Sequence, residues 1–241
     1  MPKSAVDRKE MMVYNIPQYQ RKVKNMFKAV IFDLDGTLCY TIDDLRTAMN
    51  AMLEEKGYPV RSKEEIYAAI NFGSREFVRR SLPEELRADE DEVTGCHKLY
   101  SSHYDIHYLD STYPYAGIPE VLEKLRAKGL KMGVLSNKGD SHTKKMVSKL
   151  FREGLFDEVL GGSERFPHKP EPQSALWMAS QLGVEPREVL YVGDSNIDME
   201  TARNAGFFAC GVTWGYRDEL VLTSSGASAL VRDPKEFLLY F

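Results

Sequence analysis

Short apolar runs alternate with amphipathic stretches along most of the chain. Runs of apolar, partly β-branched residues predict strands that are buried on both faces. Five such runs are present, at residues 28–32, 130–135, 156–160, 188–192 and 207–213. Between them, apolar residues recur at helical spacing, at residues 118–125, 146–150, 173–182 and 196–205. From residue 112 onward this alternation predicts an α/β fold with a doubly wound parallel sheet.

Residues 44–111 follow a different pattern, because no strand is evident in them. Ser62–Glu65 predicts a capping box at the start of a short helix. The polar stretch 84–109 predicts helix with a break at Gly95. We interpret this block as a helical cap inserted into the sheet-forming core. The predicted organisation is an N-terminal extension at residues 1–26, a core at 27–43 and 112–241, and the cap at 44–111.

Polar residues stop three of the predicted strands, at Asp33, Ser136 and Asp194. Ligands of doubly wound sheets bind beyond the carboxyl ends of the strands, so these side chains mark a candidate site. Asp33 and Asp35 lie two residues apart and can converge on one point. Two such carboxylates repel each other unless a divalent cation lies between them. Gly36 allows a sharp turn there, and Thr37 adds a hydroxyl.

Five residues at or after the ends of later strands have chemistry that fits this site. Ser136 and Asn137 follow the second strand, where a hydroxyl and backbone amides can hold phosphoryl oxygens. The ammonium of Lys169 suits both a phosphate and a carboxylate. Asp194 can complete the oxygen shell of a metal with Asp33. Asp198, one helical turn later, can support Lys169 or a metal-bound water. Each motif alone also has an ordinary structural interpretation, as a turn or a helix cap.

Taken in order, four motifs resemble those of the haloacid dehalogenase-like phosphatases. They are D-L-D-G-T-L at 33–38, S-N-K at 136–138, K-P-E-P at 169–172 and G-D-S-N-I-D-M-E-T-A-R-N-A-G at 193–206. The dehalogenases of this superfamily lack the second aspartate, so Asp35 favours phosphoryl chemistry. The resemblance implies a Rossmann-like core with an inserted α-helical cap. Residues 113–117 and 212–216 look like the phosphoglycolate phosphatase group, a narrower and less specific match.

The resemblance also implies roles for the residues of these motifs. Asp33 is expected to attack phosphorus and form an aspartyl-phosphate, with Asp35 as general acid and base. Mg²⁺ is expected on Asp33, on the carbonyl oxygen of Asp35 and on Asp194.

Substrate binding is expected from both the core and the cap. Thr37, Ser136, Asn137 and Lys169 would bind the phosphorylated substrate at the core. Arg75 would bind it from the cap, since an arginine can hold a carboxylate bidentately. An exposed helix charge is an equally good interpretation of Arg75.

Composition narrows the function further. The net charge of −4 disfavours a nucleic-acid partner, and no apolar run approaches the ~20 residues that cross a membrane. Cys39, Cys96 and Cys210 form no C-x-x-C pair, and the first nine residues contain no apolar signal segment. We therefore expect a cytoplasmic enzyme, a monomer or homodimer, with a small phosphorylated molecule as its partner.

The expected function is Mg²⁺-dependent hydrolysis of a small phosphomonoester, with phosphoglycolate as the substrate that the narrower resemblance suggests. A sugar phosphomutase, an inorganic pyrophosphatase and a nucleotidase fit the same scaffold. A non-catalytic binding module is disfavoured, because both Asp33 and Asp35 are present.

Overall fold

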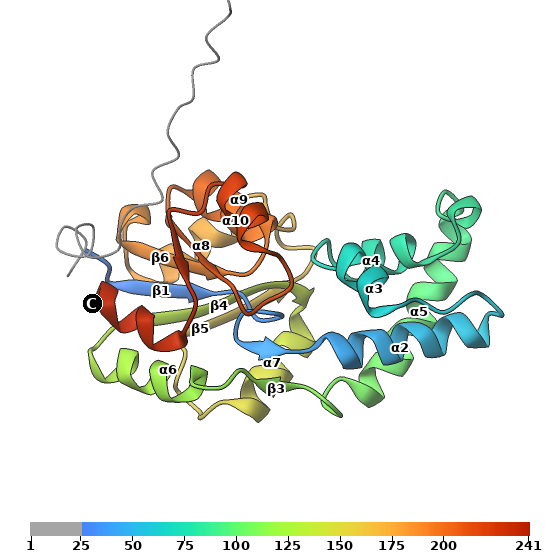
Figure 1. Cartoon of the computed structure of the whole chain (residues 1–241), viewed down its shortest axis with the longest axis horizontal. Coiled ribbons are helices and arrows are strands. Elements are labelled where there is room, and N and C mark those ends of the chain that lie inside the picture. The colour runs from blue at the N-terminus through green and yellow to red at the C-terminus, as the bar shows by residue number, and fades with distance from the viewer. Residues whose placement is uncertain (1–25) are drawn as a thin grey trace, which may run out of the picture.

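A six-stranded parallel sheet runs through the body of the molecule in the computed structural model, which describes residues 26–241 (Figure 1). Its strands, in spatial order, are β5 (Glu158–Gly162), β4 (Lys131–Gly139), β1 (Ala29–Phe32), β6 (Val189–Gly193), β7 (Phe208–Val212) and β8 (Ala229–Val231). The predicted doubly wound sheet is confirmed, with β8 added at one edge. The predicted extension at residues 1–26 lies, apart from Met26, outside the described residues.

Strand β1 lies at the point where the strand order reverses. Phe32 at its end pairs with Val134 of β4 on one side and with Val192 of β6 on the other. The carboxyl ends of these three strands therefore meet at one edge of the sheet, where ligands of such sheets bind.

Alternate side chains of the strands enter two hydrophobic cores, one on each face of the sheet. Val30 and Phe32 of β1 pack on one face, and Ala29 and Ile31 on the other. The first face is covered by α6 (Ile118–Ala127), α7 (Asp140–Leu150) and the 3₁₀ helix η3 (Pro234–Tyr240). The second is covered by α8 (Gln173–Leu182), α9 (Asn196–Ala205) and α10 (Glu219–Ser224), and the short 3₁₀ helix η2 (Pro186–Glu188) precedes β6.

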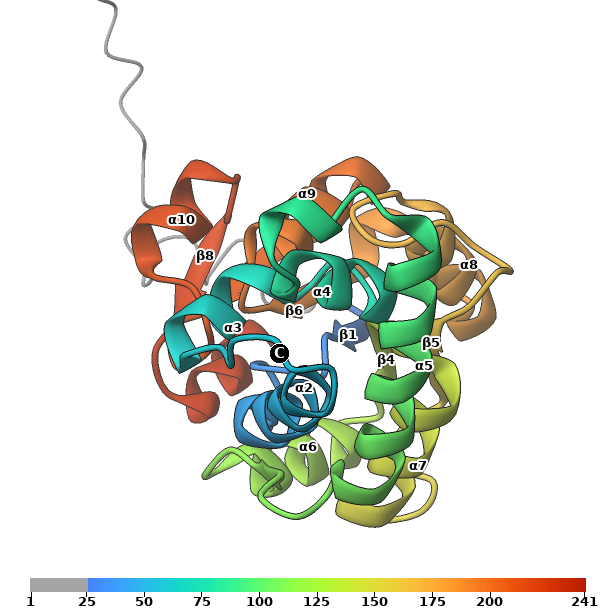
Figure 2. The same ribbon diagram turned by 90° about the vertical axis from the view of Figure 1, so that its right-hand side faces the viewer.

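A helical lobe lies beyond the carboxyl ends of the strands and has its own core (Figures 1 and 2). It consists of α2 (Ile42–Glu55), α3 (Lys63–Ala69), α4 (Ser74–Ser81), η1 (Glu84–Leu86) and α5 (Glu90–His107). Seen from the lobe, α2, α4 and α5 are arranged around the end of β1 (Figure 2). The predicted capping box is present, since Ser62 Oγ accepts from Glu65 N and Glu65 Oε2 accepts from Ser62 N.

The predicted break at Gly95 is wrong, because α5 continues through this residue to His107. One glycine lowers helix stability only modestly, and packing of Val93, Cys96 and Tyr100 into the lobe core outweighs that cost.

The two chain segments that join lobe and body are tied to each other. The short strands β2 (Cys39–Tyr40) and β3 (Tyr113–Pro114) pair antiparallel, and the rings of Tyr40 and Tyr113 stack at 5.2 Å. The buried carboxylate of Asp44 accepts hydrogen bonds from Ser111 N (2.8 Å) and Thr112 Oγ1 (2.8 Å). These contacts fix where the lobe starts and ends relative to the sheet. None of the helices within residues 26–241 is long and apolar enough to cross a membrane.

Candidate active site

The turn after β1 brings two carboxylates to the edge of the sheet. Asp33 is buried, and its backbone N–H donates to Val192 O of the neighbouring strand (2.9 Å). Gly36 has a φ of 82°, and a Cβ there would lie 2.4 Å from Asp194 Oδ2. Only glycine therefore allows the turn to approach the acidic residue at the end of β6 so closely.

Three buried aspartates converge at this edge. Asp33, Asp194 and Asp198 each offer a carboxylate oxygen, and these oxygens lie within 4.8 Å of one another. Asp194 is held by Thr37 Oγ1, which donates to its Oδ1 (3.2 Å), and by Tyr216 N, which donates to its Oδ2 (2.7 Å).

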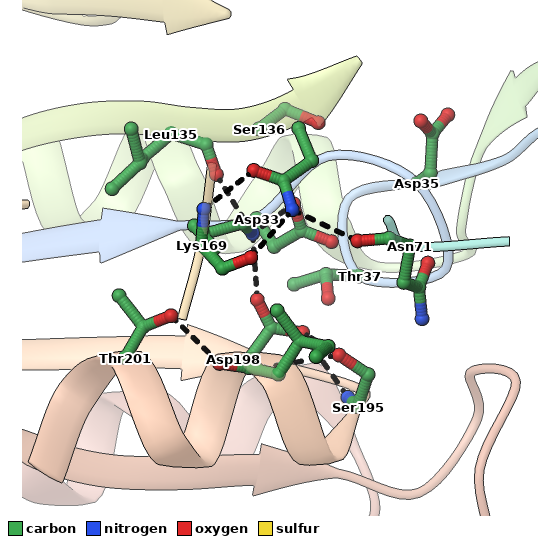
Figure 3. A network of polar contacts seen from close by, with 12 residues as sticks. Asp33, Asp35, Thr37, Asn71, Leu135, Ser136, Lys169, Ser195, Asp198 and Thr201 are labelled. Carbon is green, nitrogen blue, oxygen red and sulfur yellow. Dashed lines mark hydrogen bonds and ion pairs between the residues drawn. The ribbon is translucent and has the colours of Figure 1, made fainter. Parts of the chain in front are cut away.

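Lys169 lies between two of these aspartates, as Figure 3 shows. Its Nζ donates to Asp33 Oδ1 (2.8 Å), Asp198 Oδ1 (2.7 Å) and the carbonyl oxygen of Leu135 (3.2 Å). The second oxygen of Asp198 accepts from Ser195 N (3.1 Å) and Ser195 Oγ (2.6 Å). Both oxygens of Asp198 are thus engaged by the protein, which suits a residue that positions Lys169.

Burial and mutual repulsion raise the pKa values of Asp33 and Asp194. Burial raises the pKa of Asp33 well above its usual value; Lys169 opposes this shift, and Asp198 and Asp194 add to it. Burial, followed by repulsion from Asp198, raises the pKa of Asp194 to about 7. Burial alone would lower the pKa of Lys169, but the carboxylates of Asp198 and Asp33 outweigh it and hold that pKa well above its usual range.

The cluster fits a hard divalent cation. Fully ionised, it holds three carboxylates against one ammonium, so a cation would relieve the repulsion that raises these pKa values. Carboxylate and carbonyl oxygens are the ligands that such cations prefer. The side chain of Asp35 is not part of the cluster, so from this residue only the backbone carbonyl would serve as a ligand.

The carboxylate of Asp35 instead pairs with a lysine that the sequence interpretation left without a role. Lys138 Nζ donates to Asp35 Oδ1 (3.0 Å) and Oδ2 (2.9 Å), and both side chains are largely buried. Lys138 lies two residues after Ser136 on β4, at the carboxyl end of the strand where the side chains of the site gather. This spacing is the signal in the sequence that could have pointed to Lys138.

The S-N-K motif also joins the lobe to the body. Ser136 is buried at the end of β4, and its Oγ accepts from Lys138 N (3.2 Å). The side chain of Asn137 is occupied by structural contacts: Oδ1 accepts from Lys169 N (2.8 Å), and Nδ2 donates to Asn71 O (2.8 Å) and Lys169 O (3.0 Å). From Asn137, only the backbone amide would serve a ligand.

A cavity of about 130 Å³ lies between the sheet edge and the lobe. The core side of its lining includes Asp33, Asp35, Ser136, Asn137 and Lys169. Its lobe side includes Asn71, Ser74, Phe77, His97 and Tyr104.

Two of the predicted substrate-binding residues do not line this cavity. Thr37 points to Asp194, so its hydroxyl supports an acidic residue of the cluster. The guanidinium of Arg75 is half-exposed and donates to Glu90 Oε2 (2.9 Å) and Thr94 Oγ1 (2.9 Å) on α5. The helix phase of α4 turns Phe77 inward and Arg75 toward its neighbour α5, which residue spacing alone does not reveal.

Known proteins are similar to this chain in sequence and in fold. The haloacid dehalogenase-like hydrolase family matches residues 30–212. A phosphoglycolate phosphatase of Haemophilus influenzae is 30% identical over 221 residues, covering 90% of this chain and 99% of its own length. One from Thiobacillus denitrificans is 34% identical, covering 85% and 91%.

A solved structure agrees with these relatives. The crystal structure of a predicted phosphoglycolate phosphatase from Haemophilus somnus is 28% identical, with a TM-score of 0.83 and coverage of 88% of this chain and 97% of that one. Sequence and fold therefore agree along nearly the whole length of the proteins compared. The chain belongs to the haloacid dehalogenase-like hydrolase family and is one of its phosphatases.

Proposed function

We propose that this chain is a Mg²⁺-dependent phosphomonoester hydrolase that uses Asp33 as a nucleophile and acts on phosphoglycolate or a molecule of similar size. The observation that carries the proposal is the arrangement at the end of β1. Asp33 faces a small cavity with Lys169 bound to one of its oxygens and two more aspartates beside it. Such a site can hold an anionic group against a buried carboxylate only when positive charge offsets both.

The chain's own residues divide the chemistry between them. Lys169 anchors Oδ1 of Asp33, so attack on phosphorus falls to Oδ2 and produces an aspartyl-phosphate. Asp35 lines the same cavity, protonates the leaving oxygen and then removes a proton from the water that releases phosphate. Lys169, Ser136 and the Asn137 backbone amide bind the phosphoryl oxygens.

The side chains of Asp33 and Asp194 and the carbonyl oxygen of Asp35 would hold the metal. A bound Mg²⁺ would offset the charge that develops on the transferring phosphoryl group. Thr37 and Tyr216 N keep Asp194 oriented for this role. Asp198 keeps Lys169 in place between the cluster and the cavity.

The helical lobe, residues 44–111 in our proposal, acts as a cap that excludes water and limits the leaving group. The cavity of about 130 Å³ is smaller than the ~300–1,000 Å³ usual for drug-sized ligands. This favours a leaving group of a few heavy atoms over a nucleoside, and phosphoglycolate is the substrate named for the relatives. The described cysteines are all free and buried, which suits the reducing cytoplasm that we propose as its location.

A phosphate-release screen tests the proposal. The wild-type protein should release phosphate from phosphoglycolate and from p-nitrophenyl phosphate, lose this activity in a chelator, and regain it with Mg²⁺. Asp33→Asn should abolish turnover while leaving the circular dichroism spectrum and melting temperature close to wild type. Turnover without any metal, or an active Asp33→Asn variant, would contradict the scheme.

The same screen separates the alternative activities. A phosphomutase would convert a sugar phosphate to its isomer with little free phosphate. A pyrophosphatase or a nucleotidase would turn over its own substrate with a kcat/KM above that for phosphoglycolate.

A further inference from the structure

Two buried polar atoms on the lobe side of the cavity have no hydrogen-bond partner within residues 26–241. They are the side-chain nitrogen Nδ2 of Asn71 and the hydroxyl of Tyr104, and both residues line the cavity. Nearly all buried polar groups in proteins are paired, so unpaired ones that face a cavity mark where a ligand completes the bonding.

The backbone of Asn71 is held in a conformation that few residues adopt. Its φ is 84°, in the left-handed region that asparagine tolerates better than most residues. Its carbonyl oxygen accepts from Asn137 Nδ2 (2.8 Å), next to the proposed phosphoryl site. Asn71 and Asp35 both lie on the side of Asp33 away from Lys169 in Figure 3, and the amide nitrogen of Asn71 carries no dashed line there.

Tyr104 approaches the same region from α5. The residue is 3% exposed, and its ring lies 4.9 Å from Lys138 Nζ, the group that holds Asp35. Burial, with the nearby charge of Asp35, raises the pKa of Tyr104 well above its usual value, so its hydroxyl remains a donor.

These groups share one chemical property. The nitrogen of Asn71 and the ammonium of Lys138 are donors only, and the hydroxyl of Tyr104 is a donor at neutral pH. The other lysine of the cavity, Lys169, pairs with Asp33 and Asp198, where we propose that it binds the phosphoryl group. His97 and His142 also line the cavity, and burial lowers both of their pKa values, so they bring no full charge at pH 7. One ammonium and two further donors can together bind an anionic oxygen through charge-assisted hydrogen bonds.

We propose that Asn71 Nδ2, the Tyr104 hydroxyl and Lys138 Nζ form a subsite for a carboxylate on the leaving group of the substrate. The inference rests on the proposed phosphatase function, because Lys138 contacts Asp35, the residue that we propose protonates the leaving oxygen. It assigns the substrate to the phosphorylated small hydroxy acids. It also gives Lys138 a second role beside its contact with Asp35.

Steady-state kinetics with three esters test the subsite in the presence of Mg²⁺. Phosphoglycolate carries the carboxylate, ethyl phosphate has the same carbon chain without it, and p-nitrophenyl phosphate reports basal turnover. The wild-type kcat/KM for phosphoglycolate should exceed that for ethyl phosphate at least about tenfold, the size of one hydrogen bond to a charged group.

Two variants of nearly unchanged side-chain shape isolate the new contacts. Tyr104→Phe should raise KM for phosphoglycolate about tenfold and leave the values for the other two esters within about twofold. Asn71→Asp keeps a residue that tolerates left-handed backbone but repels a carboxylate, so its KM for phosphoglycolate should rise further. Tyr108→Phe is the matched control: its ring lies 6.1 Å from that of Tyr104 but does not line the cavity, and all three esters should be unaffected.

The outcomes separate this inference from the proposed function. Turnover of ethyl and p-nitrophenyl phosphate without a preference for phosphoglycolate would overturn the subsite alone. So would an equal loss with all three esters in both variants. A wild-type protein that hydrolyses none of the three would overturn the proposed function itself.

Discussion

The role of each residue in this site depends on which atom its side chain contacts. Thr37 and Asp33 are four residues apart, yet Asp33 faces the cavity and Thr37 faces Asp194. A hydroxyl that supports a metal ligand and one that binds substrate have different kinetic effects, so the placement of Thr37 can be tested.

Thr37→Val removes the hydroxyl with little change of shape. We expect the Mg²⁺ concentration for half-maximal activity to rise about tenfold or more, because groups that orient metal ligands affect metal affinity by about 10–100-fold. At saturating Mg²⁺ the KM for substrate should stay near wild type. Thr201→Val is the control. It also removes a buried hydroxyl, one that donates to Ile197 O, and it should leave the Mg²⁺ requirement unchanged. A raised KM at saturating metal would instead make Thr37 a substrate contact.

Arg75 offers the complementary case. Its guanidinium pairs with Glu90 on the surface of the lobe, and such exposed pairs contribute little to stability. Arg75→Ala should therefore leave the KM for phosphoglycolate within about twofold of wild type, and the melting temperature nearly unchanged. A selective rise of KM for the carboxylate-bearing substrate would show that Arg75 turns into the cavity when substrate binds.

At the scale of elements, α5 does most to shape the lobe side of the cavity. It runs from Glu90 to His107 and packs Val93, Cys96, Tyr100 and Tyr104 into the lobe core. Asp89 caps its start by accepting from Asp91 N and Glu92 N, and three acidic residues in its first turn favour the positive end of the helix.

Gly95 is the weak point of α5, and its replacement gives a stability prediction. A Cβ at this position would meet nothing within 4 Å, and its φ is not in the left-handed region. Gly95→Ala should therefore stabilise the protein by about 0.5–1 kcal/mol, through the lower entropy of the unfolded chain. Thermal unfolding should show a rise of about 1–4 °C. A lower melting temperature would mean that α5 does not run continuously through residue 95.

At the scale of the whole molecule, the site is a meeting of two bodies with separate cores. The body that surrounds the sheet supplies the acids and Lys169, and the lobe closes the cavity above them. The hydrogen bonds from residues 111–112 to the Asp44 carboxylate hold together the two chain segments that connect these bodies. Metal binding should stabilise the assembled site, because it relieves repulsion that only the folded chain creates.

The stabilisation by Mg²⁺ should depend on pH. The pKa of Asp194 is about 7 in the folded state and 3.8 in its ordinary state. As the pH falls, Asp194 therefore takes up a proton in the folded state before it does so in the unfolded state. Without metal, the carboxylate therefore costs stability above pH 7, and this cost falls as the pH falls toward 4. At pH 8, Mg²⁺ at about 100 times its dissociation constant should raise the melting temperature by about 5–10 °C. At pH 5.5 protons compete for the same oxygens and the rise should be smaller.

Differential scanning calorimetry with and without chelator measures this effect, with matched NaCl as the ionic-strength control. Asp194→Asn should remove most of the Mg²⁺ response. An equal response at both pH values, or one that survives in Asp194→Asn, would place the metal elsewhere.

The sequence by itself determined the parallel sheet and the residues at the ends of its strands. An apolar run that stops at a polar residue is a local pattern, and parallel strands bring their carboxyl ends to one edge whatever the rest of the chain does. Asp33, Ser136 and Asp194 could therefore be placed together from the sequence, with Lys169 and Asp198 added through the motifs.

Only the tertiary structure decided which side chains meet across that edge. The pairing of Lys138 with Asp35, the turn of Thr37 toward Asp194 and the unpaired donors of Asn71 and Tyr104 all depend on contacts between residues far apart in the chain. Strand β8 is similar, since the three residues 229–231 form a strand only because the edge of β7 is there to pair with them. Residue spacing specifies direction within one element, but not how two elements are placed against each other.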